Sequence, residues 1–424
     1  MSDSHKQDWA ENAGPNFTTR EGHRKWLFEQ AAALFDFFEP HSINPVGGFH
    51  ALDDFGMPLP AKQEHNGSER QLHETTRMVH CFTIGKLIGR AHADEFIDHG
   101  MDFLWKRHRD LKNGGYFWGI DDSAPTNATK QAYGHAFVLL AGASAKIAGH
   151  PDADRMITDI TEILLKRFWE PEFGATSEEY TADWQVISDY RGQNSNMHLT
   201  EALMAAYEAT DDQVYLEMAE SIADLIINRH AREQGWRVAE HFDARWKVDL
   251  GYAGDPMFRP AGTTPGHALE WSRLLVQLWE LGGRRKPWIV EAAKSLFLTT
   301  ADIGWSKQTG GFYYTLDWNN VPDRSDRFWW VVAEGIGAAD ALGKIDDNPT
   351  FETWYRRIWG VVDAHFIDHE RGGWIPELDD ELRPVSHVFT GKPDLYHALQ
   401  ACLLPLTKGD GSITKGLDLT AERN

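Results

Sequence analysis

Histidines and glutamates near predicted helix starts are the residues of this chain that could do chemistry. A Pro-Gly break at 265–266 begins an amphipathic helix, and His267 and Glu270 share one face of its first turns. Imidazole has an unperturbed pKa of about 6.5, and a neighbouring carboxylate can orient it, so such a pair can transfer protons near neutral pH. His198 and Glu201 repeat the spacing on another predicted helix. The pattern indicates a proton-transfer site, although a histidine in this place can also simply cap its helix.

Other predicted helix starts carry polar or aromatic residues, and each has two interpretations. Arg77 is either an inward fork for hydroxyls or an oxyanion, or a surface partner of Glu74. His135 is either a satisfied core histidine or a participant in the chemistry. Trp329 and Trp330 are either core residues or rings that stack on a sugar. The full candidate set is Arg77, Asn194, His198, Arg259, His267, Glu270, Trp330, Glu334 and His397.

Carboxylates among these candidates raise the question of a metal. Glu334 lies on an apolar helix, where an unpaired charge is costly, so we expect it to face a cavity or to meet an arginine. The two His-x-x-Glu pairs are similar to the helices of di-metal carboxylate proteins. A metal site would need further inward carboxylates, and His397 has no glutamate three or four positions away. We therefore expect no metal and no cofactor, with the glutamates orienting the imidazoles.

A glycine-led segment occurs six times, at intervals of 59–76 residues, and positions the candidates in a repeated unit. Each segment has the period-two pattern of a short hairpin, and the segments begin near Gly48, Gly115, Gly174, Gly235, Gly311 and Gly373. The helices predicted before them span 22–38, 93–111, 152–168, 213–231, 286–302 and 350–367. The helices predicted after them, richer in small residues, span 69–89, 130–149, 195–212, 265–283, 326–345 and 393–406.

Two helices in each of six units predict an all-α fold, an (α/α)6 toroid of twelve helices with short β-hairpin loops at one end. The second helices would form an inner barrel, and all their N-termini would lie beside the hairpins, where helix dipoles supply partial positive charge. The barrel is predicted over 21–407, between a flexible segment at 1–20 and a polar, frayed tail at 408–424. Two long aperiodic loops, 44–69 and 244–264, are typical of lids.

Composition excludes several classes of function. The net charge is −22, so a nucleic acid or an anionic membrane surface is an improbable partner, and no apolar run is long enough to span a bilayer. Cys81 and Cys402 lie in apolar helical contexts, which predicts buried thiols and favours the cytoplasm. Phosphate-binding glycine loops and nucleophile elbows are missing, which argues against nucleotide sites and acyl transfer. Glycoside hydrolysis would need a pair of carboxylates, whereas the best-placed groups here are histidines.

Four segments together make the chain resemble the N-acylglucosamine 2-epimerase superfamily, and more closely its aldose–ketose isomerase branch. They lie at 48–54, 194–198, 265–271 and 391–398. The resemblance implies an (α/α)6 barrel without a required metal. It also implies that His267 and His397 are the acid and base, and that the other candidates bind or orient substrate, Arg259 being matched least securely. The Lys-Pro-Asp-Leu-Tyr-His lead-in at 392–397 differs from that of the acylglucosamine epimerases and favours an isomerase.

The expected reaction is interconversion of D-mannose and D-fructose through a cis-enediolate, and D-lyxose/D-xylulose would also fit. His267, held by Glu270, would open the sugar ring, and His397 would carry a proton between C2 and C1, although the two roles could be exchanged. The alternatives are a sulfoquinovose isomerase, a sugar 2-epimerase, an (α/α)6 glycoside hydrolase and a non-catalytic sugar-binding or protein-interaction role. A sulfonate would need an extra cation, for which Arg259 or Lys392 could serve. The sequence leaves the oligomeric state open.

Overall fold

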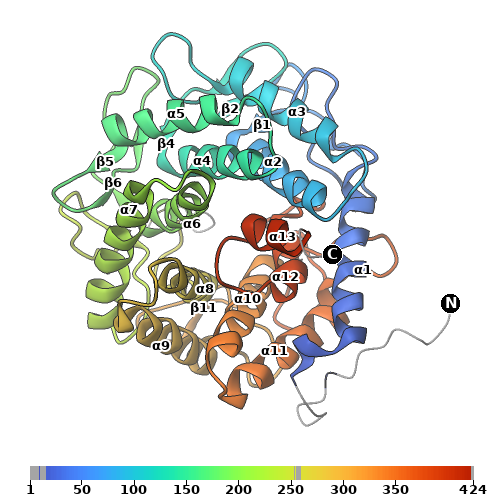
Figure 1. Cartoon of the computed structure of the whole chain (residues 1–424), viewed down its shortest axis with the longest axis vertical. Coiled ribbons are helices and arrows are strands. Elements are labelled where there is room, and N and C mark those ends of the chain that lie inside the picture. The colour runs from blue at the N-terminus through green and yellow to red at the C-terminus, as the bar shows by residue number, and fades with distance from the viewer. Residues whose placement is uncertain (1–8, 10–15, 253, 255–258, 422–424) are drawn as a thin grey trace.

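Twelve helices form two concentric rings in the computed structural model, which describes residues 9, 16–252, 254 and 259–421 (Figure 1). The inner ring consists of α2 (Leu72–Leu87), α4 (Ala132–Ile147), α6 (Gln193–Thr210), α8 (Pro265–Leu281), α10 (Trp329–Ile345) and α12 (Tyr396–Leu403). The outer ring consists of α1 (Glu21–Phe38), α3 (Ala93–Phe103), α5 (Ala153–Ile163), α7 (Gln213–Ala223), α9 (Pro287–Gly304) and α11 (Pro349–Val361). Each inner helix contacts the next, and α12 returns to α2, so the ring is closed. The predicted (α/α)6 toroid is confirmed.

The inner helices pack closely because their walls are made of small and apolar residues. In α10, Gly335, Gly337, Ala338 and Ala339 are all buried. Four outer helices end in a wide π-helical turn before the next hairpin. These turns are Leu104–His108, Leu164–Phe168, Asp224–Ala231 and Val362–Phe366. Cys81 and Cys402 are buried free thiols, as predicted.

Short strands lock each unit to the next at one end of the barrel. The strands are β1 (Arg70–Gln71), β2 (Gly119–Ile120), β3 (Pro125–Asn127), β4 (Lys130–Gln131), β5 (Trp169–Glu170), β6 (Ala175–Thr176), β7 (Glu179–Tyr180), β8 (Arg191–Gly192), β9 (His241–Phe242), β10 (Thr315–Leu316), β11 (Pro322–Arg324), β12 (Arg327–Phe328) and β13 (Glu377–Leu378). The residues that lead into an inner helix pair with the hairpin of the following unit, as in β1–β2, β4–β7, β8–β9 and β12–β13. Single bridges complete the ring, Thr263 with Leu316 and Lys392 with Leu52.

The closing bridge depends on a glycine. Gly391 has φ +67°, and a Cβ there would lie 2.1 Å from the Leu52 carbonyl oxygen, so a side chain would prevent this contact. The bridge fastens the long loop at 44–69 to the last inner helix. A lid function for this loop and for 244–264 stays a prediction, and positions 253 and 255–258 of the second loop lie outside the described residues.

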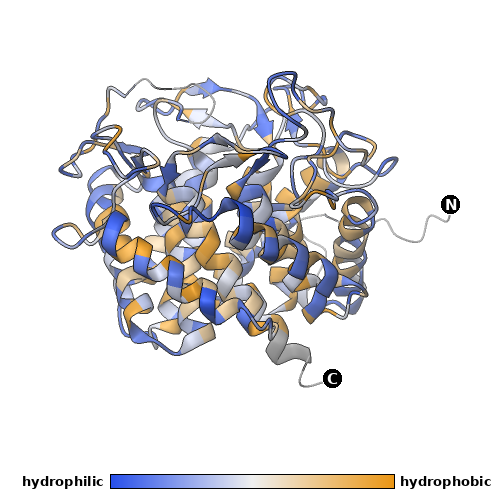
Figure 2. Cartoon of the chain, turned by 90° about the horizontal axis from the view of Figure 1, so that it is seen from above, coloured by the Kyte–Doolittle hydropathy of each residue, from blue (hydrophilic) through white to orange (hydrophobic). Residues whose placement is uncertain are grey.

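The two ends of the barrel differ. Hairpins, bridges and the N-termini of the inner helices lie at one end, and the C-terminus lies at the other (Figure 2). At that far end, residues after 407 form α13 (Ile413–Ala421), which contacts α2, α4 and α6. Ile413 and Leu417 are buried, and the Ser412 amide donates to Glu208 of α6 at 2.7 Å. The tail is therefore packed up to Leu417, where its polar composition predicted fraying.

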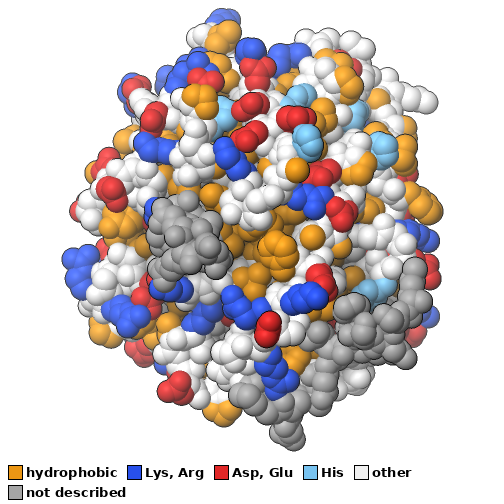
Figure 3. All heavy atoms as spheres, turned by 45° about the vertical axis from the view of Figure 1, so that its right-hand side comes forward, with side chains coloured by type: hydrophobic (Ala, Val, Ile, Leu, Met, Phe, Trp, Pro, Cys, Tyr) orange, Lys and Arg blue, Asp and Glu red, His pale blue; other side chains and the backbone are white. Residues whose placement is uncertain are grey.

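The described part of the N-terminal segment is also packed. Trp9 donates from its indole nitrogen to Asp363 at 2.9 Å and stacks on Trp359, and Phe17, in a short 3-10 turn at Phe17–Thr19, is buried. The expectation of a flexible segment is wrong at these residues, and 1–8 and 10–15 lie outside the described part. None of the described helices has the length and apolar character needed to cross a membrane. One surface shows charges of both signs around a central group of hydrophobic side chains (Figure 3).

Candidate active site

The inner helices place the candidate residues at one depth inside the barrel. Arg77, His198, Glu270 and Glu334 are each the sixth residue of their helix, in α2, α6, α8 and α10. All four are buried and face neighbouring helices of the ring. Since these four helices start at the same end of the barrel, their sixth residues lie in one layer. The repeat therefore explains why residues far apart in the sequence meet.

His267 forms the first histidine–carboxylate pair, near the mouth. It is the third residue of α8, its side chain is 14% exposed, and its Nδ1 lies 2.8 Å from a carboxylate oxygen of Glu240. Glu240 also accepts hydrogen bonds from the Gln193 side chain at 2.8 Å and the Thr264 amide at 3.2 Å. The prediction that Glu270 is the partner of His267 is wrong. Glu270 lies one turn further along α8 and contacts His198 instead.

His397 forms the second pair and is the more buried of the two histidines, with a side chain 6% exposed. It is the second residue of α12, and its Nδ1 lies 2.8 Å from Oε1 of Glu334 on α10. Because a carboxylate only accepts, Nδ1 of each paired histidine carries a proton and Nε2 is left as the reactive nitrogen. No hydrogen bond to either Nε2 is found within the described part of the chain.

Trp330 brings the two pairs to one space. Its ring centroid lies 5.2 Å from that of His267 and 5.9 Å from that of His397. The close approach needs Gly266, since a Cβ at that position would lie 2.3 Å from the indole. Trp330 is partly exposed, whereas its neighbour Trp329 is buried in the core. The two histidines therefore flank one aromatic wall.

A buried arginine joins the carboxylates of three helices. Arg273 of α8 donates from Nε to Glu334 at 3.0 Å, and its other nitrogens lie 3.6 Å from Glu201 and 3.7 Å from Glu270. Glu201 also accepts a short hydrogen bond from the Tyr396 hydroxyl. The prediction that Glu334 meets an arginine is confirmed, and the same carboxylate holds His397.

The carboxyls around Arg273 have pKa values shifted in opposite directions. Burial, with the charge of Glu334 adding to it, raises the pKa of Glu270 well above its usual range. Burial acts the same way on Glu334, but Arg273 and His397 outweigh it and lower the pKa of this carboxyl. The two environments therefore favour the neutral form of Glu270 and the ionised form of Glu334.

Comparison with known proteins identifies the family of this chain. Residues 47–401 match the model of the N-acylglucosamine 2-epimerase family. The chain belongs to this family. It is 40% identical to a D-mannose isomerase of Thermobifida fusca, over 92% of this chain and 96% of the relative. It is 38% identical to a D-mannose isomerase of Pseudomonas cannabina pv. alisalensis, over 93% and 96%. A crystal structure of D-mannose isomerase superposes with a TM-score of 0.85 at 31% identity, covering 93% of this chain and 99% of that one.

Several buried polar atoms of this epimerase-family site have no hydrogen-bond partner among the described residues. They are Arg77 Nε, Asn194 Oδ1, His198 Nδ1, Glu270 Oε1 and one terminal nitrogen of Arg273. Unpaired buried polar atoms are costly, so a cluster of them indicates a site that receives a polar ligand. Donors and acceptors are both present, which matches the hydroxyl groups of a sugar.

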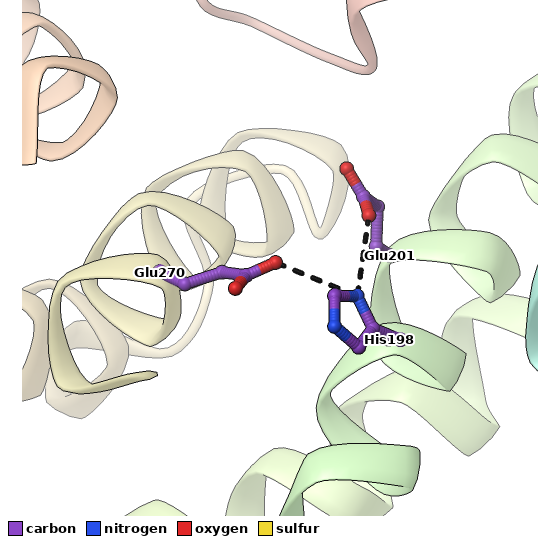
Figure 4. A group of neighbouring side chains, drawn as sticks. All are labelled: His198, Glu201 and Glu270. Carbon is purple, nitrogen blue, oxygen red and sulfur yellow. Dashed lines mark ion pairs between the residues drawn. The ribbon is translucent and has the colours of Figure 1, made fainter. Parts of the chain in front are cut away.

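His198, Glu201 and Glu270 point toward one another from α6 and α8 (Figure 4). Nδ1 of His198 lies 3.5 Å from Glu270 and 3.9 Å from Glu201, and the three ligand atoms lie within 4.8 Å of one another. A divalent ion at this point would meet the guanidinium of Arg273, which already approaches both carboxylates. Burial lowers the pKa of His198 to about 4, so this imidazole is neutral at pH 7.

Arg77 lies in the same layer as this cluster, whereas Arg259 and His135 lie away from it. Arg77 points inward, with one terminal nitrogen 3.0 Å from Asp394 and the other donating to the Tyr133 hydroxyl at 2.9 Å. Arg259 lies nearer the rim, 3.4 Å from Glu179. His135 is a core residue, because both of its ring nitrogens bond to backbone groups, at Tyr116 and Gln131.

Sequence reasoning missed two residues of the site, Glu240 and Arg273. Glu240 lies on a hairpin, 27 positions before its partner His267, so helical spacing could not find it. The feature of the sequence that could have pointed to Glu240 is its position in the hairpin, two residues before Phe242, which pairs with Arg191 of β8. Arg273 lies three residues after Glu270 on an apolar helix, and a charge there has to be paired.

Proposed function

We propose that this protein is an aldose–ketose isomerase that interconverts D-mannose and D-fructose. The observation that carries the proposal is the position of Trp330 between His267 and His397, with each imidazole held at Nδ1 by its own carboxylate. Two oriented bases on one aromatic wall suit a reaction that moves protons at adjacent carbons. The family membership and the similarity to D-mannose isomerases over more than nine tenths of the chain support the same reaction.

The proposed chemistry divides between the two histidines. His267, nearer the mouth, transfers a proton between the ring oxygen and O1 and so opens the sugar. Nε2 of His397 then removes the proton from C2 and returns it to C1 on the same face of a cis-enediolate. The O2 hydroxyl proton passes to O1 in the enediolate, so that the aldose becomes a ketose. Glu270, whose pKa is raised by burial, can donate a hydrogen bond in its neutral form, and with the Nε–H of Arg77 and the inner-helix N-termini it would stabilise the negative charge on the enediolate oxygens.

Proton exchange with solvent tests these roles. The protein is incubated with D-mannose in D2O, and NMR follows the products and deuterium at C1 and C2. We expect D-fructose as the product, and we expect the His397→Ala variant to lose both turnover and exchange. His92→Ala, which removes an exposed histidine just before α3, should change neither. Exchange retained by the His397 variant would overturn the assignment. D-Glucose as the product would indicate a 2-epimerase instead.

The sulfoquinovose alternative is weakened because both cations that could serve a sulfonate already have carboxylate partners. Lys392 is buried and bonds to Asp368 at 2.8 Å and to the Gly372 carbonyl, so it holds the hairpin end together. Arg259 is engaged by Glu178 and Glu179 and lies over the Tyr190 ring. A sulfonate would have to displace these carboxylates. Measuring the turnover of D-mannose and of sulfoquinovose in one assay distinguishes the two substrates.

A cytoplasmic location stays a prediction of the sequence.

A further inference from the structure

A second group of ligand-type side chains lies at the hairpin end, apart from the histidine pairs. Asp326 precedes β12, Glu377 lies in β13, and His387 lies in the loop after that strand's hairpin. One ligand atom from each lies within 4.8 Å of the others, and Nδ1 of His387 is 3.6 Å from an oxygen of each carboxylate. We propose that these three residues form a divalent-cation site that fastens the loop at 385–390 beside the active-site mouth.

The strongest observation for a cation is the unpaired oxygen of Glu377. The side chain is fully buried, and its Oε2 accepts from the amides of Val388 and Phe389 at 2.8 and 3.3 Å. Its Oε1, directed toward His387 and Asp326, has no hydrogen-bond partner among the described residues. A buried carboxylate oxygen without a partner is costly, and a bound ion would supply the missing interaction.

The spacing is close to that of a bound metal ion. Two ligands at about 2.1 Å from a zinc ion and at a tetrahedral angle lie about 3.4 Å apart. The two distances of 3.6 Å from His387 to the carboxylates therefore need only a small closure. Two carboxylates and one imidazole suit Zn²⁺ or Mn²⁺, with solvent at the open positions.

Asp326 keeps one oxygen for an ion, and the site is open to solvent. Arg324 approaches the other oxygen of Asp326, at 3.5 Å, and leaves Oδ1 facing His387. His387 is 62% exposed, so an ion can reach the site from solvent.

The proposed site lies next to the active-site wall. The amide of Phe389 donates to Glu377. The ring centroid of Phe389 lies 4.9 Å from that of Trp329 and 5.2 Å from that of Phe328. Trp329 directly precedes Trp330, the ring between the two catalytic histidines. An ion that joins His387 to Glu377 would therefore hold the 385–390 loop against the first turn of α10.

Calorimetric titration of the EDTA-treated full chain with ZnCl2, and separately with MnCl2, tests the site. We expect one binding step that His387→Ala and Glu377→Gln each weaken by at least about tenfold. The matched control is His369→Ala, because His369 is also exposed and lies beside one carboxylate, Asp363 at 3.3 Å, without a third ligand. This control should bind the ion as the parent protein does.

Hydrogen exchange provides a second readout that does not depend on activity. The metal should slow amide exchange at 385–390 in the parent protein and in His369→Ala, and leave exchange unchanged in His387→Ala. Circular dichroism checks that each variant is folded, and His387→Ala carries the test if the buried Glu377 variant does not fold. No binding step for either ion, or a step retained in His387→Ala, would overturn the proposal. A retained step would place the ion elsewhere, for example at His198.

Discussion

The two histidine–carboxylate pairs have the same local geometry but very different surroundings. His267 meets Glu240, which comes from a hairpin and is otherwise held by an amide side chain and a backbone N–H. His397 meets Glu334, which comes from the barrel wall and is also bound to Arg273. Both distances are 2.8 Å, yet the first pair depends on a loop and the second on a buried charge network. The difference matches their proposed tasks, ring opening at the mouth and proton transfer at carbon inside.

Removing the charge of Glu334 should therefore lower kcat more than removing the charge of Glu240. This is the largest effect that we expect. Glu334→Gln is expected to lower kcat by about 10³-fold, because it removes both the orienting anion of His397 and a counter-charge of Arg273. Glu240→Gln is expected to cost about 10-fold to 10²-fold, since the amide oxygen can still accept from His267. Ketose formation measures kcat for both variants. Equal losses would mean that the surroundings of the pairs do not matter.

Arginine substitution sharpens the same contrast in terms of stability. Arg273 is 2% exposed and approaches three carboxylates, so Arg273→Met should lower the free energy of unfolding by about 3–5 kcal/mol. Arg259, 31% exposed at the rim, also lies near two carboxylates, and Arg259→Met should cost at most about 1 kcal/mol. Urea unfolding measures both. Similar losses in the two variants would show that the buried network contributes no more than a surface pair.

Five buried histidines predict acid lability. Burial lowers the pKa of His23 and His135 to about 3, and of His80, His108 and His198 to about 4. These groups are neutral in both states above pH 6.5. As pH falls from 6.5 toward 4, the unfolded chain binds protons that the folded chain excludes, so stability is lost. Each histidine with a folded pKa of about 4 costs about 2 kcal/mol at pH 5.

Two carboxyls oppose this trend without cancelling it. Burial raises the pKa of Glu74 and Glu208 to about 7, so they are protonated in the folded state and favour it as pH falls. The unfolding midpoint in urea should still fall between pH 7 and pH 5, and His80→Asn should flatten that slope, while His92→Asn at the surface should not. A midpoint independent of pH over this range would contradict the prediction.

The sequence predicts the barrel well because its repeat is local. Six glycine-led hairpins and the helical periodicity between them are short-range patterns, and they place the sixth residues of the inner helices in one layer. Contacts between different kinds of element have no such pattern. The pairing of His267 with Glu240 joins an inner helix to the hairpin that precedes it in the same unit, and the packing of Ile413 in the tail depends on the barrel end that it covers. These contacts depend on the three-dimensional arrangement of the barrel and leave no short-range pattern in the sequence.

Trp330 connects the two pairs, and its substitution should have the smallest effect of those considered. Trp330→Leu removes the aromatic wall between His267 and His397 but keeps both histidine–carboxylate bonds. A stacked aromatic ring contributes about 0.5–1.5 kcal/mol, so KM should rise about two- to tenfold with little change in kcat. Trp329→Phe is the matched control, because its buried ring should affect thermal stability and leave KM unchanged. If Trp330→Leu lowered kcat at constant KM, the ring would be positioning the imidazoles and not the sugar.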